Sequence, residues 1–232
     1  MFQFRSIAAL GSATLLLSST ALAHVGVNGP GIAGTNQVLT FGVGHGCEGL
    51  DTVAIEIAIP SEVTAVRALV GPAGWGEAEL TVNDAELVTA VKWEKAESRA
   101  ADDSYYQFGL RIGVPDMPFK TLYFPATQTC RDADGEDVVV EWSLTAEEAE
   151  GAGEHAAEAP ALKIVPKRSN GWNKFTVADK IEDLSIFDDA QIVWLGDKAY
   201  SSNETTKELI DSDDDVGELT EIPADSEIWV KY

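Results

Sequence analysis

The sequence predicts an all-β protein, in which an antiparallel β-sandwich is followed by a small β-rich module. Apolar and β-branched residues come in short runs that alternate with polar ones, and Gly, Pro, Asp or Asn separates the runs. Many short strands at such spacing are typical of a sandwich. Before residue 145, no stretch has the periodicity of an amphipathic helix three turns long.

The expected strands of the sandwich follow one another along the first part of the chain. Residues 38–43 and 52–59 show the clearest alternation of apolar and polar side chains. The other expected strands cover residues 65–70, 87–93, 105–113, 121–124 and 138–144. The stretch that follows, residues 145–159, is rich in Ala and Glu, but Gly151 and Gly153 interrupt it. We therefore expect a mobile acidic loop there.

The chain divides into two predicted domains. Residues 24–165 form the sandwich, residues 166–170 are a linker, and residues 171–232 form the small module. A unit of about 60 residues without a disulfide is marginally stable by itself. We therefore expect the module to pack on the first domain or in an oligomer, and the sequence leaves the oligomeric state open.

Within the module, strands are expected at residues 172–177, 190–195 and 227–231. Four aromatic residues are expected to fill its small core: Trp172, Trp194, Tyr200 and Trp229.

The 232-residue chain is strongly acidic, with 39 Asp and Glu against 16 Lys and Arg and a formal net charge of −23. Proteins that bind nucleic acid or anionic lipid neutralise phosphates with Lys and Arg. We therefore expect neither as a partner. A charge of this sign suits a protein that attracts cations.

The first 23 residues have the pattern of a cleaved signal peptide. Arg5 precedes an apolar run over residues 7–17, and Ala21-Leu22-Ala23 places small residues at the two positions that a signal peptidase reads. The run is too short to span a bilayer, and no second one follows. We expect an exported protein, periplasmic or extracellular, without a membrane span. Cleavage would make His24 the first residue of the mature chain.

The chain has two cysteines, Cys47 and Cys130. In an exported protein such a pair most simply forms one disulfide. The bond would close a loop of about 80 residues and contribute up to ~4 kcal/mol in the chain-entropy model. A soft metal site built on the two thiolates is the alternative.

An N-terminal histidine is a chelating group by itself. Its α-amine and its Nδ1 can close a six-membered ring on one metal ion, and with pKa values of about 8 and about 6.5 both become neutral donors at little cost. Two nitrogens combined with a carboxylate in tetragonal geometry favour Cu(II). The alternative interpretation is that His24 only marks the cleavage site.

Two further residues suit a metal site. Glu48 lies in the turn 45–49, which Cys47 would tie to Cys130, so that its carboxylate would sit on a rigid element. Trp142 lies near the end of a predicted strand, and an indole face attracts a desolvated cation by about 1–2 kcal/mol. Taken singly, each has an ordinary explanation, Glu48 as a solvated turn acid and Trp142 as a core residue.

An ordered set of motifs runs through the predicted sandwich. In chain order the motifs are His24-Val25, Gly46-Cys47-Glu48-Gly49, residues 54–60, Gly71-Pro72-Ala73-Gly74-Trp75, Val91-Lys92-Trp93, residues 106–110, residues 122–130 and Glu141-Trp142. Over residues 24–165 this set resembles the YcnI-like family of exported copper-binding domains. Gln107 departs from the family pattern, in which an acid usually precedes Phe-Gly, and residues 171–232 lie outside the resemblance.

The resemblance implies a cupredoxin-like or immunoglobulin-like β-sandwich that binds one Cu(II) through a monohistidine brace. His24 would supply its amine and imidazole nitrogens. Glu48 matches the family's carboxylate ligand, and Trp142 matches the tryptophan beside the metal. His45, beside the Cys47 turn, and His155, in the acidic segment, are weaker candidates for an additional ligand.

The resulting hypothesis is a copper-binding protein of the cell envelope and not an enzyme. It would act in copper homeostasis, by sequestering Cu(II) or, as a metallochaperone, by handing the ion to another envelope copper protein. One alternative is a copper-dependent oxidative enzyme with an N-terminal histidine, which normally adds a second histidine ligand and an open position. The other is a metal-free surface β protein, in which the tryptophans of the module serve only packing.

Overall fold

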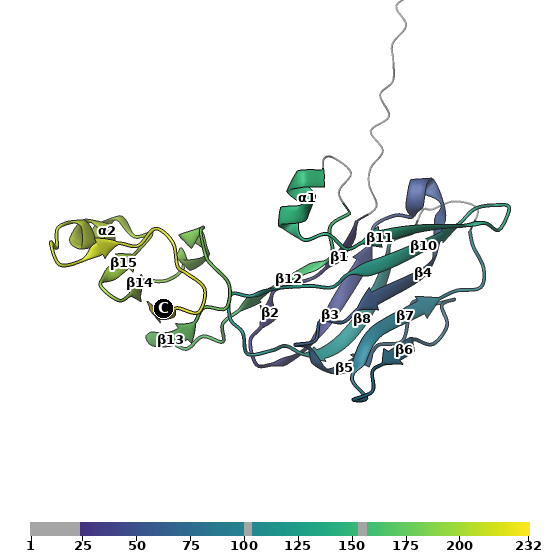
Figure 1. Ribbon diagram of the computed structural model, residues 1–232, viewed down its shortest axis with the longest axis horizontal. Helices are drawn as coiled ribbons and strands as arrows, with labels where there is room; N and C mark the ends of the chain where they lie inside the picture. Colours follow the sequence, from purple (N-terminus) through teal and green to yellow (C-terminus); the bar gives the residue numbers. More distant parts are fainter. Residues whose placement is uncertain (1–23, 100–103, 153–156) are drawn as a thin grey trace, which may run out of the picture.

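The computed structural model describes residues 24–99, 104–152 and 157–232, without the side chain of Glu48. The predicted signal peptide, residues 1–23, and His155 lie outside these ranges. The described protein is mostly β, as predicted (Figure 1). In Figure 1 the sandwich and the C-terminal sheet lie at opposite ends of the long axis, with β2 and β12 between them.

Two antiparallel sheets form the sandwich, with strand orders β1-β3-β8-β5 and β11-β10-β4-β7-β6. The strands of the first sheet are β1 (Val25–Val27), β3 (Asn36–Val43), β8 (Tyr106–Gly113) and β5 (Thr64–Ala68). Those of the second are β11 (Asp137–Trp142), β10 (Ala126–Arg131), β4 (Asp51–Ala58), β7 (Val88–Glu94) and β6 (Glu79–Val82). A third, small sheet combines β2 (Gly31–Ile32), β12 (Ala161–Val165) and β9 (Thr121–Tyr123), and β2 pairs with β12 in parallel.

The core of the sandwich follows from alternation along the central strands. Phe41 of β3 and Phe108 of β8 point inward from the first sheet, and Ile57 of β4 and Trp93 of β7 do so from the second; all four are 0% exposed. Burying one such side chain contributes about 1.5–3 kcal/mol. The alternation that the sequence shows in residues 38–43 and 52–59 therefore fixes which face of each strand is covered.

The expectation of a loop over residues 145–159 is wrong, because α1 (Ala146–Ala152) occupies part of it. Thr145 and Glu148 form a capping box: the Thr145 N–H donates to Glu148 Oε2 at 2.8 Å, and the Glu148 N–H donates to Thr145 Oγ1 at 3.3 Å. Ala149 is buried. The cap and this one contact allow a short helix despite Gly151 near its end.

The C-terminal part has a sheet and a core of its own. The sheet has the order β13-β17-β14-β15-β16, formed by β13 (Trp172–Thr176), β17 (Glu227–Lys231), β14 (Ile192–Leu195), β15 (Lys198–Tyr200) and β16 (Gly217–Glu218). The 3-10 turn η2 (Leu184–Phe187) and α2 (Glu204–Asp211) complete this part. Its buried cluster consists of aliphatic side chains and Phe187.

The expectation that Trp172, Trp194 and Trp229 fill this core is wrong, whereas the fourth predicted residue, Tyr200, does pack against it. Trp172 is 50% exposed and Trp229 is 48% exposed. The neighbours of Trp194 on β14 and of Trp229 on β17 face the core instead: Val193, Ile228 and Val230 are each 0% exposed. The tryptophans therefore lie on the other face of the sheet.

Phe119, in the loop between β8 and β9, joins the sandwich to the C-terminal core. Its ring centroid lies 5.9 Å from that of Phe175 and 5.2 Å from that of Phe187. Its φ of 68° is a left-handed value that bulky residues rarely adopt. The ring contacts offset the cost of this backbone conformation, which is roughly 1–3 kcal/mol.

Replacing Phe119 by Ala should destabilise the C-terminal part by about 1–2 kcal/mol, below the range for a fully buried Phe because Phe119 is only half-buried. The change removes the ring contacts and keeps the strained backbone. Urea unfolding followed by tryptophan fluorescence measures the effect, with the exposed Ile186→Ala as the control. Equal midpoints for both variants would show that Phe119 does not couple the two parts.

Candidate metal centre

The candidate centre lies where one edge of each sandwich sheet meets the other. β1 is an edge strand of the first sheet and β11 is an edge strand of the second. His24 directly precedes β1, and Trp142 is the last residue of β11. Their rings are in contact, with centroids 5.5 Å apart and planes inclined by 45°. The structure thus brings together two of the three residues of the predicted site.

The two rings differ in their access to solvent. His24 is exposed, whereas Trp142 is only 1% exposed. A ligand from solvent can therefore reach the imidazole, while the indole forms a fixed apolar surface beside it. An indole within about 6 Å of a cation attracts it electrostatically. The pair suits a cation that is held by the imidazole.

A buried hydrogen-bond network centred on Gln128 fixes the position of Trp142. The indole N–H donates to Gln128 Oε1 at 3.2 Å. Gln128 is 0% exposed, and its Nε2 donates to Thr52 Oγ1 at 2.8 Å and to the His45 carbonyl at 3.1 Å. Fully satisfied buried networks are rigid. This network links the indole to the turn that begins at His45.

That turn leads into η1 (Cys47–Gly49), a 3-10 turn that contains Glu48 and lies against β10 and β11. Cys47 and Cys130 form the predicted disulfide, with Cα atoms 5.8 Å apart. The alternative of a metal site on two thiolates is wrong, because both sulfurs belong to the disulfide. The bond ties η1 to β10, next to the strand that carries Trp142.

A buried ion pair anchors the chain on the other side of η1. Asp51, the first residue of β4, is 1% exposed and accepts hydrogen bonds from Lys95 Nζ at 2.7 Å and from the Tyr106 hydroxyl at 2.9 Å. Burial by itself would raise the pKa of Asp51, but the hydrogen bonds from Lys95, the Arg99 backbone N–H and Tyr106 outweigh it and lower the pKa. Glu48 thus lies between two fixed points, the disulfide and this ion pair.

The other predicted ligands are placed only in part. The backbone of Glu48 lies in η1, but its side chain and the whole of His155 lie outside what the structure describes. The His45 ring is half-buried, and its Nδ1 lies 3.0 Å from the Gly46 carbonyl, to which only a protonated Nδ1 can donate. His45 contributes its backbone carbonyl to the network.

Among the side chains that the structure describes, which do not include that of Glu48, no group of three or more His, Cys, Asp or Glu is arranged to hold a metal ion. A histidine brace does not require such a group, because the amine and the imidazole of one residue supply two of its donors.

Gln128, which holds the Trp142 indole, and Asp51, which anchors the chain beside η1, were not predicted from the sequence. Gln128 lies between Ala126 and Cys130 on the inward face of β10, where alternation predicts an apolar residue. A polar residue at such a position signals a buried hydrogen-bond partner. The sequence therefore indicates that Gln128 has a buried hydrogen-bond partner, but it does not identify that partner.

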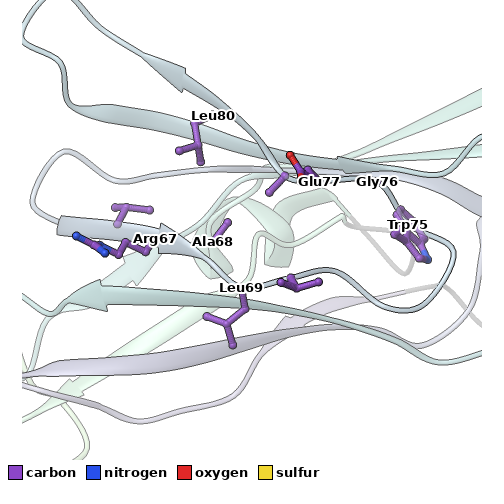
Figure 2. A pocket seen from close by; sticks show the side chains of 10 residues that line it. Arg67, Ala68, Leu69, Trp75, Gly76, Glu77 and Leu80 are labelled. Atoms are coloured by element: carbon purple, nitrogen blue, oxygen red, sulfur yellow. The ribbon is translucent and has the colours of Figure 1, made fainter.

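The opposite edges of the two sheets, β5 and β6, leave a groove of about 560 Å³ (Figure 2). Leu69, Trp75 and Leu80 contribute to its apolar lining, and Arg67 and Glu77 are its charged residues. Its lining includes neither His nor Cys. A register shift in β5 interrupts the regular edge, which in natural sheets discourages pairing with other chains.

One protein family matches the residues of the sandwich. The model of the family described as "Domain of unknown function (DUF1775)" matches residues 24–164, from the candidate ligand His24 to the last strand of the third sheet. The protein belongs to the DUF1775 family. No curated protein matches this DUF1775 chain.

This DUF1775 protein is similar to several solved structures. One is titled "Crystal structure of an uncharacterized protein from Nocardia farcinica reveals an immunoglobulin-like fold"; it is 29% identical, with a TM-score of 0.50, over 61% of this chain and 98% of that chain. It agrees with the immunoglobulin-like form of the expected sandwich. A cohesin module from a Clostridium perfringens family 33 glycoside hydrolase is 12% identical, with a TM-score of 0.34, over 63% of this chain and 100% of that chain.

The disulfide bears on the cellular location of the DUF1775 protein. The disulfide is compatible with an oxidising compartment outside the cytosol. In the described part of the chain, no helix is long and apolar enough to cross a membrane.

Proposed function

We propose that this DUF1775 protein, once cleaved before His24, binds one Cu(II) ion through the amine and imidazole of that residue. It holds the ion in the cell envelope, for sequestration or for delivery to another protein. The observation that carries the proposal is the contact between the exposed His24 ring and the buried Trp142 ring. A solvent-facing imidazole on a fixed indole is a suitable position for a captured cation.

The chemistry of the donors supports copper. The amine and Nδ1 belong to one residue, so chelation needs no rearrangement of the fold. Two nitrogen donors and one carboxylate suit Cu(II), which also has the highest affinity in the divalent series. We assign the carboxylate to Glu48, because the disulfide at Cys47 and the ion pair at Asp51 fix its backbone on both sides.

The resemblance to the YcnI-like copper-binding family supports the same assignment, because its motifs at His24, Glu48 and Trp142 fall inside the region that matches DUF1775. The Trp142 ring beside His24 favours a copper-binding role over oxidative catalysis. Copper enzymes of that kind use a second histidine ligand, and here the neighbouring ring is an indole.

The test is a Cu(II) titration of protein that begins at His24, combined with thermal unfolding. We expect one Cu(II) per chain and a rise in Tm, because a ligand that binds only the folded state adds about 2.7 kcal/mol at a concentration of 100 Kd. His24→Ala should lose the tight site, and the matched control His45→Ala should keep it. Unchanged copper binding in His24→Ala, or loss in His45→Ala alone, would refute the assignment.

A further inference from the structure

A second site candidate lies on the outer face of the C-terminal sheet, far along the chain from His24 and outside the DUF1775 region. Trp172 on β13, Trp229 on β17 and Trp194 on β14 lie on three neighbouring strands, and Trp194 is directly opposite Trp229 in the register. Together with Gly196 they line a shallow cavity of about 410 Å³, within the range of about 300–1,000 Å³ that is usual for small ligands. We call these residues the tryptophan face.

The packing of this part of the protein does not account for the tryptophan face. Its core is closed from the other side of the sheet by Val193, Ile228 and Val230. Two of the three indoles are about half exposed, at 50% for Trp172 and 48% for Trp229. Large aromatic side chains gathered in the open on adjacent strands mark an interaction site more often than a structural one.

Charged groups border the indoles. Lys231 Nζ lies 5.9 Å from the Trp172 ring centroid, and Lys174 Nζ lies 5.9 Å from that of Trp229. Lys174 also pairs with Glu227 at 2.6 Å. The chain itself thus places cations against two of the rings, which disfavours a cationic ligand. The border offers both hydrogen-bond donors and a carboxylate acceptor.

We propose that the tryptophan face binds a neutral saccharide chain. A pyranose ring carries C–H groups on its faces and hydroxyls around its edge. The C–H groups can pack on the electron-rich indole faces, while the hydroxyls exchange hydrogen bonds with Lys174, Lys231 and Glu227.

The size of the face also favours a small ligand over a protein. A tryptophan offers about 250 Å² at most, so the partly exposed indoles present roughly 300 Å² in total. A stable protein interface needs about 800 Å² from each partner. The tryptophan face is therefore large enough for a few sugar rings and too small to hold a second copy of the chain by itself.

The experiment titrates the whole mature chain with cellohexaose and with chitohexaose, followed by tryptophan fluorescence and calorimetry. We expect binding of at least one of them, weakened by roughly tenfold or more in Trp229→Ala and Trp172→Ala, and largely kept in Trp229→Tyr. The matched control is Leu209→Ala, an exposed apolar side chain on α2. Because the site is separate from the proposed copper site, His24→Ala should bind the saccharide as the parent protein does.

Absence of binding to both hexasaccharides at millimolar concentration would overturn the proposal, as would equal affinities in Trp229→Ala and Leu209→Ala. So would self-association of the parent protein that Trp229→Ala abolishes, because it would assign the face to a second copy of the chain. Unchanged Tm values of the tryptophan variants would show that lost binding does not come from unfolding.

Discussion

A protein with one additional residue ahead of His24 should bind Cu(II) at least about a hundredfold more weakly than the protein that begins at His24, a loss of about 2.7 kcal/mol. In the extended chain the nitrogen of His24 is an amide, whose lone pair is delocalised into the peptide bond. The imidazole then binds without its chelating partner. A competition titration against a chelator of known copper affinity measures the difference.

This comparison is sharp because the extension leaves every side chain of the site unchanged. His24, Glu48 and Trp142 are all present in both proteins, and equal Tm values without copper would show that the fold is the same. Equal copper affinities would mean that the amine is not a ligand. The site would then have to be built from side chains alone, and the brace would be wrong.

Alternation along the strands made much of the sandwich predictable. Expected strands at 38–43 and 52–59 correspond to β3 and β4, where apolar residues face a covered side at every second position. Strands were not predicted where the pattern of apolar and polar residues does not follow burial. All four residues of β6 are exposed, so its sequence shows little alternation of apolar and polar residues. In β10 the polar residue Gln128 is buried, because its side chain forms hydrogen bonds with Thr52 and Trp142, which are distant in the sequence.

The tryptophans of the C-terminal sheet show a second limit of prediction from the sequence. Alternation divides a strand into two faces but does not say which face the rest of the protein covers. In β17 both faces carry large apolar residues, Ile228 and Val230 on one and Trp229 on the other. The large size of the indole was the reason for predicting that it lies in the core. The structure buries the aliphatic face, because the elements around η2 pack there.

The candidate metal centre was predicted from a family resemblance and from the chemistry of an N-terminal histidine. Spacing along the chain does not reveal that His24 meets Trp142, because the contact joins edge strands of two different sheets. The disulfide was the one long-range contact that the sequence specified by itself, since Cys47 and Cys130 have no other cysteine partners.

Replacing Asp51 by Asn should destabilise the sandwich by about 3–5 kcal/mol, because it leaves the Lys95 ammonium buried without a counter-charge. Lys95 is 7% exposed, and its nearest acidic partner is Asp51 at 2.7 Å. Chemical unfolding at pH 7 measures the loss. The matched control is Asp137→Asn, which breaks the exposed ion pair with Arg131 and should cost at most about 1 kcal/mol.

The double variant Asp51→Asn, Lys95→Met should recover part of this loss, because it removes the unpaired charge along with its partner. The unfolding free energy at acidic pH provides a second test of the role of Asp51. The folded-state pKa of Asp51 is below its ordinary value of 3.8, so its contribution to stability is present above that pH and is lost as the pH falls through the folded-state value. The gap in unfolding free energy between parent and Asp51→Asn should therefore narrow below about pH 4. A gap that stays constant down to the acid unfolding transition would mean that the carboxylate charge is not what stabilises the chain beside η1.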